Sequence, residues 1–225
     1  MKAGMTIIRN IVRPSKELVE AFRDIPAANL DDCMGRTASI GSSIFPIGKK
    51  KILGTAFTVR VPQGDNLMVH KVLDMAQPGD ILVIDAGGYM NRSIMGSLMA
   101  TYCNVRGLAG IVINGCIRDR DELSNMDFPV YACGSTPNGP YKNGPGEINV
   151  PVTIGDRVIF PGDIIAGDGD GLVVIRPQEA ESVLADVKKI MLKEAEIMKG
   201  ILEKRLYPRP WVDDKLRELG YENIE

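Results

Sequence analysis

Apolar residues along the chain follow two different spacings in turn. The apolar runs at 81–84 and 110–113 are typical of strands that are covered on both faces of a sheet. Residues 94–105 and 119–126 instead place apolar side chains three or four positions apart, which predicts amphipathic helices. A third strand is expected at 129–132. Strands that alternate with helices in this way predict a parallel sheet with helical crossovers, and thus an α/β fold.

The pattern extends this arrangement toward the N-terminus. Ser15 precedes an apolar-periodic stretch, so a helix capped by its side chain is predicted at 16–22. A second short helix is expected at 29–34, a strand at 54–61 and a helix at 64–76.

The second half of the chain has a different texture. Residues 135–147 are rich in Gly, Pro and Asn and have no period, which predicts a long ordered loop. The sequence Pro-Gly-Asp-Ile occurs at 78–81 and again at 161–164, and we interpret it as one turn type used before two strands. Short strands separated by tight turns are expected at 150–154, 157–160, 163–166 and 172–175.

The C-terminal part is predicted to be helical. A long helix is expected at 177–204, and Pro208 breaks it before a short terminal helix at 211–219. The apolar side of the long helix allows two interpretations, packing on the core of its own chain or on a neighbouring subunit. We therefore expect one domain at 1–176 that carries the site, and a helical extension at 177–225.

Composition narrows the class of protein. The chain has 225 residues, 44% of them hydrophobic and 25% charged, and 27 Lys and Arg against 29 Asp and Glu give a net charge of −2. This balance argues against nucleic acid as a partner, and the basic run Lys49-Lys50-Lys51 is expected to be a solvated loop. No apolar run approaches the roughly 18 residues that span a bilayer, and no secretory leader is apparent. These features favour a cytoplasmic protein.

Cysteine and histidine usage restricts the chemistry. Cys33, Cys103, Cys116 and Cys133 are widely spaced, which is typical of reduced, packed thiols rather than of a disulfide framework or a zinc site. His70 is the only histidine, so a metal would be held by carboxylates, carbonyls and water. These ligands are preferred by Mg²⁺ or Mn²⁺.

The most suggestive segment follows the strand predicted at 110–113. Arg118 and Asp119 lie just beyond it, where open α/β sheets bind ligands. An Arg can clamp a carboxylate through two parallel hydrogen bonds, and the adjacent Asp can bind a hard cation, which together suit a 2-keto acid on a divalent ion. The alternative is that Asp119 caps the following helix and that Arg118 pairs with an acid.

Two weaker constellations lie nearby. Gly87-Gly88 and Gly96-Ser97-Leu98 place small residues after a strand and at a helix start, where backbone amides can approach an anion. His70 lies one helical turn after Gly64-Asp65-Asn66. A surface or interface histidine is the favoured interpretation there, and a catalytic base is the alternative.

Five motifs in order give a resemblance that covers roughly residues 20 to 180. The chain resembles the family that contains the 4-hydroxy-4-methyl-2-oxoglutarate aldolases and the regulator of ribonuclease activity A. The motifs are Gly64-Asp65-Asn66-Leu67-Met68-Val69-His70, Gln77-Pro78-Gly79-Asp80-Ile81, Gly107-Leu108-Ala109-Gly110-Ile111-Val112, Gly115-Cys116-Ile117-Arg118-Asp119 and Gly146-Glu147-Ile148-Asn149-Val150-Pro151-Val152.

The resemblance implies a fold and an activity. The family fold is a swivelling β/β/α sandwich assembled into homotrimers or homohexamers, with the site at a subunit interface. Its aldolases are divalent-metal-dependent lyases that release pyruvate and also decarboxylate oxaloacetate. Both reactions pass through a pyruvate enolate, whose charge a metal and an Arg can stabilise.

The resemblance also implies residue roles. Asp119 would be the metal ligand and Arg118 would bind the pyruvyl oxygens. The segment that begins at Gly96, with the backbone amides of Ser97 and Leu98, would hold the substrate carboxylate.

Two glutamates complete this implied site, and one position departs from the family. Glu194 of a neighbouring subunit would contact a water bound to the metal. Glu122 would stand next to Asp119 without binding the metal itself. Family aldolases carry an Asp where this chain has Ser97. This departure leaves three hypotheses: a metal-dependent lyase acting on small 2-keto acids, a non-enzymatic regulator that binds an RNA-processing enzyme, and an enzyme of the same fold with a non-aldol reaction.

Overall fold

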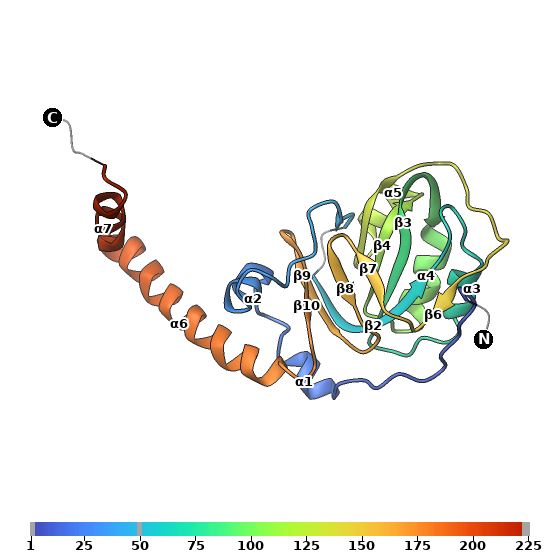
Figure 1. Cartoon of the computed structure of the whole chain (residues 1–225), viewed down its shortest axis with the longest axis horizontal. Helices are drawn as coiled ribbons and strands as arrows, with labels where there is room; N and C mark the ends of the chain where they lie inside the picture. The colour runs from blue at the N-terminus through green and yellow to red at the C-terminus, as the bar shows by residue number, and fades with distance from the viewer. Residues whose placement is uncertain (1–2, 49–50, 222–225) are drawn as a thin grey trace. The chain divides into compact units, whose positions relative to one another are not determined.

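The computed structural model describes residues 3–48 and 51–221 (Figure 1), so Lys49 and Lys50 of the basic run lie outside the described residues. The first half of the chain contains α1 (Lys16–Glu20), α2 (Ala27–Cys33), β1 (Phe45–Pro46), β2 (Ile52–Arg60), α3 (Leu67–Val72), β3 (Asp80–Met95), α4 (Ser97–Val105) and β4 (Gly110–Ile117). The second half contains α5 (Arg120–Asn125), β5 (Val130–Ser135), β6 (Glu147–Ile148), β7 (Val152–Ile154), β8 (Arg157–Ile159), β9 (Ile164–Asp168), β10 (Gly171–Ile175), α6 (Ala180–Lys204) and α7 (Pro210–Glu218).

A mixed sheet forms the centre of the molecule. Its order is β1-β5-β4-β3-β2-β9-β10, and β6 also pairs with β2. The strands β2, β3, β4 and β5 are parallel to one another, which confirms the predicted crossover arrangement. The strands β1, β6, β9 and β10 pair antiparallel. The predicted α/β class is therefore confirmed, as a mixed rather than an all-parallel sheet.

The two faces of the sheet bury different layers. Successive side chains of a strand point to opposite faces, so Phe57 and Leu82 belong to one apolar cluster, with residues of α3, α4 and α5. Ala56 and Val83 belong to the other, with residues of the β7–β8 hairpin. Figure 1 shows α3, α4 and α5 near β3 and β4 at one end of the sheet. The result is a β/β/α arrangement with the apolar strands fully buried.

Two predicted elements differ from the observed ones. Residues 94–95 end β3 rather than begin a helix, because residues 93–95 pair with the last residues of β4. The register between β3 and β4 shifts after Asp85, where Gly87 and Gly88 both have φ of 66°. The predicted helix at 64–76 is observed only as Leu67–Val72, because residues 63–64 form a turn, Asp65 pairs with Tyr141, and residues 73–75 form a second turn.

The repeated Pro-Gly-Asp-Ile sequence is one turn built twice. In the first copy, Asp80 accepts a hydrogen bond from the Gln77 amide at 2.8 Å. In the second copy, Asp163 accepts from the Phe160 amide at 2.7 Å. Both carboxylates are buried, and each pairs with an arginine. Asp80 pairs with Arg13, near the N-terminal end of the core domain, and Asp163 pairs with Arg176, near its C-terminal end. The turn therefore serves as an anchor for distant segments, beyond the turn geometry that the sequence predicted.

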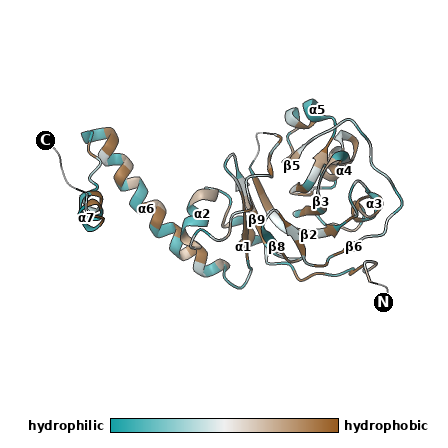
Figure 2. Cartoon of the chain, turned by 45° about the horizontal axis from the view of Figure 1, so that its top comes forward, coloured by the Kyte–Doolittle hydropathy of each residue, from teal (hydrophilic) through white to brown (hydrophobic). Residues whose placement is uncertain are grey.

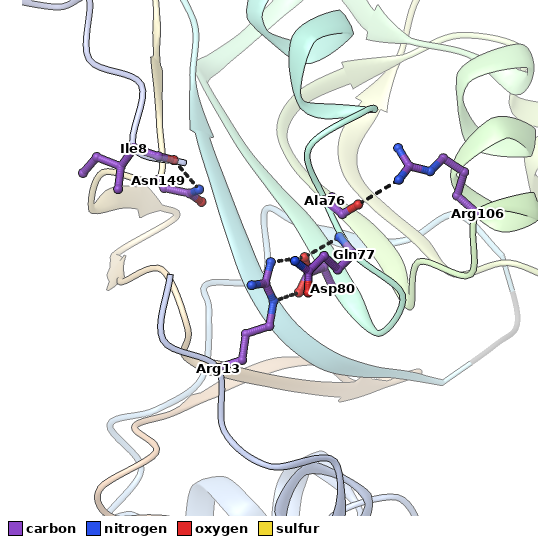
Figure 3. Close-up of polar contacts among 7 residues, drawn as sticks. All are labelled: Ile8, Arg13, Ala76, Gln77, Asp80, Arg106 and Asn149. Atoms are coloured by element: carbon purple, nitrogen blue, oxygen red, sulfur yellow. Dashed lines mark hydrogen bonds and ion pairs between the residues drawn. The ribbon is translucent and has the colours of Figure 1, made fainter. Parts of the chain in front are cut away.

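The N-terminal arm, residues 3–14, is fixed by two polar contacts that Figure 3 shows. Arg13 donates Nε and Nη2 to the two carboxylate oxygens of Asp80, at 2.8 and 2.7 Å. Asn149 donates its Nδ2 to the Ile8 carbonyl at 2.8 Å. The arm also pairs with β6 through the backbone, at Ile7 and Ile148. The arm is thus part of the folded domain.

The chain divides into two compact units, Met1–Val187 and Lys188–Glu225. The division lies inside α6 rather than before it at residue 176, because Val183 and Val187 at the start of α6 are buried within the first unit. In the second unit, α6 carries alternating hydrophobic and hydrophilic segments (Figure 2), and Leu192 and Leu202 are exposed. No described helix is both long and apolar enough to cross a membrane.

Candidate functional site

Arg118 and Asp119 join β4 to α5 at the carboxyl end of the central strands. Asp119 has φ of 57° and ψ of 41°, the left-handed conformation that few residues other than glycine adopt, although Asp and Asn adopt it more readily than most. It occupies the N-cap position of α5, but its side chain makes no capping hydrogen bond. The capping half of the alternative is therefore wrong, whereas its other half is confirmed, because Arg118 pairs with the Asp119 carboxylate. Strained residues of this kind concentrate at functional sites.

The Asp119 carboxylate turns instead toward the start of α4. Its Oδ2 accepts hydrogen bonds from the Ser97 amide at 3.0 Å and from the Ser97 hydroxyl at 3.2 Å. A Cβ on Gly96 would lie 2.3 Å from the same oxygen, so only glycine permits this approach. Arg118 Nε lies 3.7 Å from Asp119 Oδ2. The residues predicted from two separate motifs thus meet at one point.

Arg118 and Asp119 both line two hollows. One has a volume of about 340 Å³ and is also lined by Ser135 and Thr136 at the end of β5. The other has a volume of about 230 Å³, and we call it the inner hollow. Its further lining residues are Asn66, His70, Ser93, Ile94, Met95, Gly96, Leu98, Met99, Pro140 and Lys142.

Three polar residues of the inner hollow enlarge the predicted site. His70 is exposed, which agrees with the favoured surface interpretation, and it also lines this hollow. Asn66 is 2% exposed, donates its Nδ2 to the Ile94 carbonyl at 2.9 Å, and leaves its buried Oδ1 without a partner among the described residues. Lys142 was not predicted, because it lies in an aperiodic loop and no sequence signal relates that loop to Arg118.

The remaining predicted residues have different positions. Leu98 is 82% exposed on the first turn of α4 and lines the inner hollow. Glu122 is exposed on α5 and lines neither hollow. Glu194 lies on α6 in the C-terminal unit, so the site of a single chain is described without it.

The donor set around Asp119 limits the kind of metal that the site could hold. Among residues 3–48 and 51–221, no group of three or more His, Cys, Asp or Glu side chains could hold a metal ion. A half-exposed carboxylate such as Asp119 suits a hydrated Mg²⁺-like ion, which typically takes one or two carboxylates and keeps several waters.

The cysteines do not provide a nucleophile. All four are free thiols, which agrees with the predicted absence of disulfides. Burial raises the pKa of Cys103 to about 12, and burial also raises the pKa values of Cys116 and Cys133. Since the thiolate is the nucleophilic form, these thiols are unreactive near neutral pH.

Comparison with known proteins shows which family the chain matches. Residues 17–174 match the family described as RraA-like, Aldolase/RraA. A protein of Halalkalibacterium halodurans that carries the provisional name 4-hydroxy-4-methyl-2-oxoglutarate aldolase is 38% identical over 174 residues, 77% of this chain and 83% of the relative.

Two solved structures extend the comparison. RraAS2 of Streptomyces coelicolor, described as an unusual member of the RNase ES inhibitor RraA family, has a TM-score of 0.74 and is 28% identical. The match covers 83% of this chain and 100% of the neighbour. The RNA-processing inhibitor RraA of Thermus thermophilus has a TM-score of 0.63 and is also 28% identical. That match covers 68% of this chain and 93% of the neighbour.

Proposed function

Because the chain belongs to the RraA-like family of aldolases and RraA proteins, we propose that it is a divalent-metal-dependent lyase that releases pyruvate from small 2-keto acids. The substrates would be hydroxy-keto diacids of the 4-hydroxy-4-methyl-2-oxoglutarate type and oxaloacetate. The observation that carries the proposal is the left-handed Asp119, whose side chain does not cap α5, lies 3.7 Å from Arg118 Nε and lines two hollows.

Arg118 would bind the substrate and stabilise the developing charge. Its half-exposed guanidinium offers two parallel N–H groups to the carboxylate and keto oxygens of a 2-keto acid. When the carbon–carbon bond breaks, negative charge moves onto the keto oxygen, and a fixed donor aimed at that oxygen lowers the barrier. The amides of Ser97 and Leu98 at the start of α4 would hold the substrate carboxylate.

Asp119 would hold a divalent cation, Mg²⁺ or Mn²⁺, which when bound supplies a positive charge next to the keto oxygen. Glu122 would support this arrangement from α5. The exposed apolar residues of the C-terminal unit support a homotrimer or homohexamer in which Glu194 of a second copy completes the site. The four free cysteines support a cytoplasmic location.

Oxaloacetate turnover tests the proposal directly. We expect pyruvate formation, coupled to NADH oxidation by lactate dehydrogenase, that EDTA abolishes and that added Mg²⁺ or Mn²⁺ restores. Oxaloacetate also decarboxylates without an enzyme, so a reaction without protein is the control. Turnover that EDTA leaves unchanged would contradict the metal requirement.

A second candidate function rests on Ser97. Because this chain lacks the Asp of the family aldolases at that position, a regulator that acts by protein–protein binding is the alternative. Solved neighbours described as RraA inhibitors support this alternative. A same-fold enzyme with a non-aldol reaction is a third candidate. A regulator would be silent in the coupled assay with any metal, whereas the third candidate would bind metal without cleaving hydroxy-keto diacids.

Replacing Ser97 with Asp should strengthen metal binding. The Ser97 hydroxyl lies 3.2 Å from Asp119 Oδ2, so the new carboxylate would lie beside the existing one. Two opposite unit charges about 4 Å apart attract each other by roughly 4 kcal/mol at an effective dielectric constant near 20. After desolvation we expect about a tenfold gain in Mg²⁺ affinity, measured by calorimetry.

Ser97→Asn is the matched control for that measurement, since it has nearly the same shape as Ser97→Asp and no charge. Equal Mg²⁺ affinity in both variants would show that position 97 does not face the metal. Improved metal binding without faster cleavage of a hydroxy-keto diacid would favour the non-aldol enzyme.

A further inference from the structure

The inner hollow is closed on one side by a segment without regular structure. Residues 136–146, which we call the strap, connect β5 to β6. The strap contributes Pro140 and Lys142 to the lining of the hollow. A Cβ on Gly139 would lie 3.6 Å from Arg118 Nη1, so the strap backbone runs beside the guanidinium of the proposed substrate clamp. The position of the strap therefore affects both cationic residues of the hollow.

Arg92, on the irregular part of β3, binds the strap at three residues, Asn138, Gly139 and Tyr141. Its Nη1 donates to the Gly139 carbonyl at 2.6 Å and to Asn138 Oδ1 at 3.2 Å. Its Nη2 donates to the Tyr141 hydroxyl at 2.8 Å, and its guanidinium carbon lies 3.8 Å from the centre of the Tyr141 ring. The Arg92 guanidinium thus binds both Gly139, which lies near Arg118, and Tyr141, which precedes Lys142.

Neighbouring contacts fix the two ends of the same segment. Ser93 is buried and donates its amide and its hydroxyl to the Asn138 carbonyl, at 2.8 and 3.0 Å. At the other end, Asp65 Oδ2 accepts from the Asn143 amide at 2.6 Å and from the Gly144 amide at 3.1 Å. Between these ends, the Tyr141 amide donates to the Gly64 carbonyl at 2.8 Å, the Tyr141 carbonyl accepts from the Asn66 amide at 3.0 Å, and Arg92 supplies the charged side-chain contacts.

The backbone around Arg92 is shaped for this contact. A Cβ on Gly64 would lie 2.8 Å from Arg92 Cδ, so a side chain at that position would displace the arginine. The pairing of β3 with β4 changes register between Tyr89 and Ser93. Arg92 therefore lies in a part of β3 that is not paired regularly with β4. This irregular part of β3 places the Arg92 guanidinium against the strap.

We propose that Arg92 is a positioning residue of the site. It holds the strap against the inner hollow, so that the Gly139 backbone supports Arg118 and Lys142 keeps its place in the lining. The inference rests on the proposed function for its kinetic consequence, because the site acts on a substrate only if that proposal holds. The structural consequence, a strap that depends on Arg92, can be measured without any activity.

The test compares the wild type, Arg92→Ala and Arg92→Lys. We expect backbone amides within 136–146 to exchange hydrogen at least tenfold faster in Arg92→Ala, with unchanged exchange in β3, β4 and β5. Arg92→Lys should resemble Arg92→Ala, because a point charge cannot bind Gly139 and Tyr141 together. Arg36→Ala is the control, since Arg36 pairs with Asp32 on the surface and not with the strap. Unchanged exchange within 136–146 would overturn the proposal.

Kinetic measurements distinguish a residue that positions the site from one that only stabilises the fold. We expect KM for oxaloacetate to rise about tenfold in Arg92→Ala while kcat falls less than threefold. In a Lys142→Ala background the same substitution should have a smaller effect, because residues that act through one another are not additive. A loosened strap with wild-type kinetics would overturn the positioning role. A silent wild type would instead refute the proposed function, and hydrogen exchange would still decide whether Arg92 holds the strap.

Discussion

Asp119→Asn should lower kcat/KM for oxaloacetate by about 10³-fold, or roughly 4 kcal/mol of transition-state stabilisation. Asn is chosen because it tolerates the left-handed backbone at this position and can still accept the hydrogen bond from the Ser97 amide. The substitution therefore removes the charge with little change in shape. A proposed site with one carboxylate ligand on the chain has no substitute for it.

The measurement is a Mg²⁺ titration of the coupled pyruvate assay, supported by calorimetry of Mg²⁺ binding. Asp121→Asn is the matched control, because Asp121 is exposed on the first turn of α5 and lines neither hollow. If Asp119→Asn kept wild-type activity and metal affinity, the strained aspartate would have a purely structural role.

Arg13→Ala should destabilise the fold by about 3 kcal/mol, the range observed when one partner of a buried ion pair is removed. The Asp80 side chain is 1% exposed and Arg13 is 24% exposed. Without Arg13, the buried carboxylate would keep only the hydrogen bond from the Gln77 amide, which Figure 3 shows beside the arginine. The N-terminal arm would also lose its bidentate anchor.

Urea denaturation followed by far-ultraviolet circular dichroism measures this loss, because the only tryptophan, Trp211, lies in the other compact unit. Arg36→Ala, at a surface pair with side chains that are 79% and 47% exposed, should change stability by less than about 0.5 kcal/mol. Adding Asp80→Asn to Arg13→Ala should restore part of the stability, since the unpaired charge is then gone. No recovery would show that Arg13 acts through packing.

The sequence predicted the central strands because their apolar runs are long and uninterrupted. The pattern placed Arg118 and Asp119 beyond the end of a buried strand, whereas the resemblance to a known family, and not the pattern, brought Ser97 to the same site. The pattern assigned residues 94–95 to a helix because periodicity does not reveal which strand pairs with which. Arg92 and Lys142 escaped prediction for a related reason, since tertiary contacts rather than a local pattern bring them to the site.

The order of the sheet also has a consequence during synthesis of the chain. One side of β2 pairs with β3, which follows directly. On the other side only residues 59–60 pair with β6, and residues 52–55 pair with β9, about a hundred residues later. Until Ile164–Asp168 leaves the ribosome, the growing chain presents a long apolar strand with an open edge. Such edges invite pairing with other chains. We therefore expect truncated products that end before β9 to aggregate, and the nascent chain to depend on chaperones during that interval.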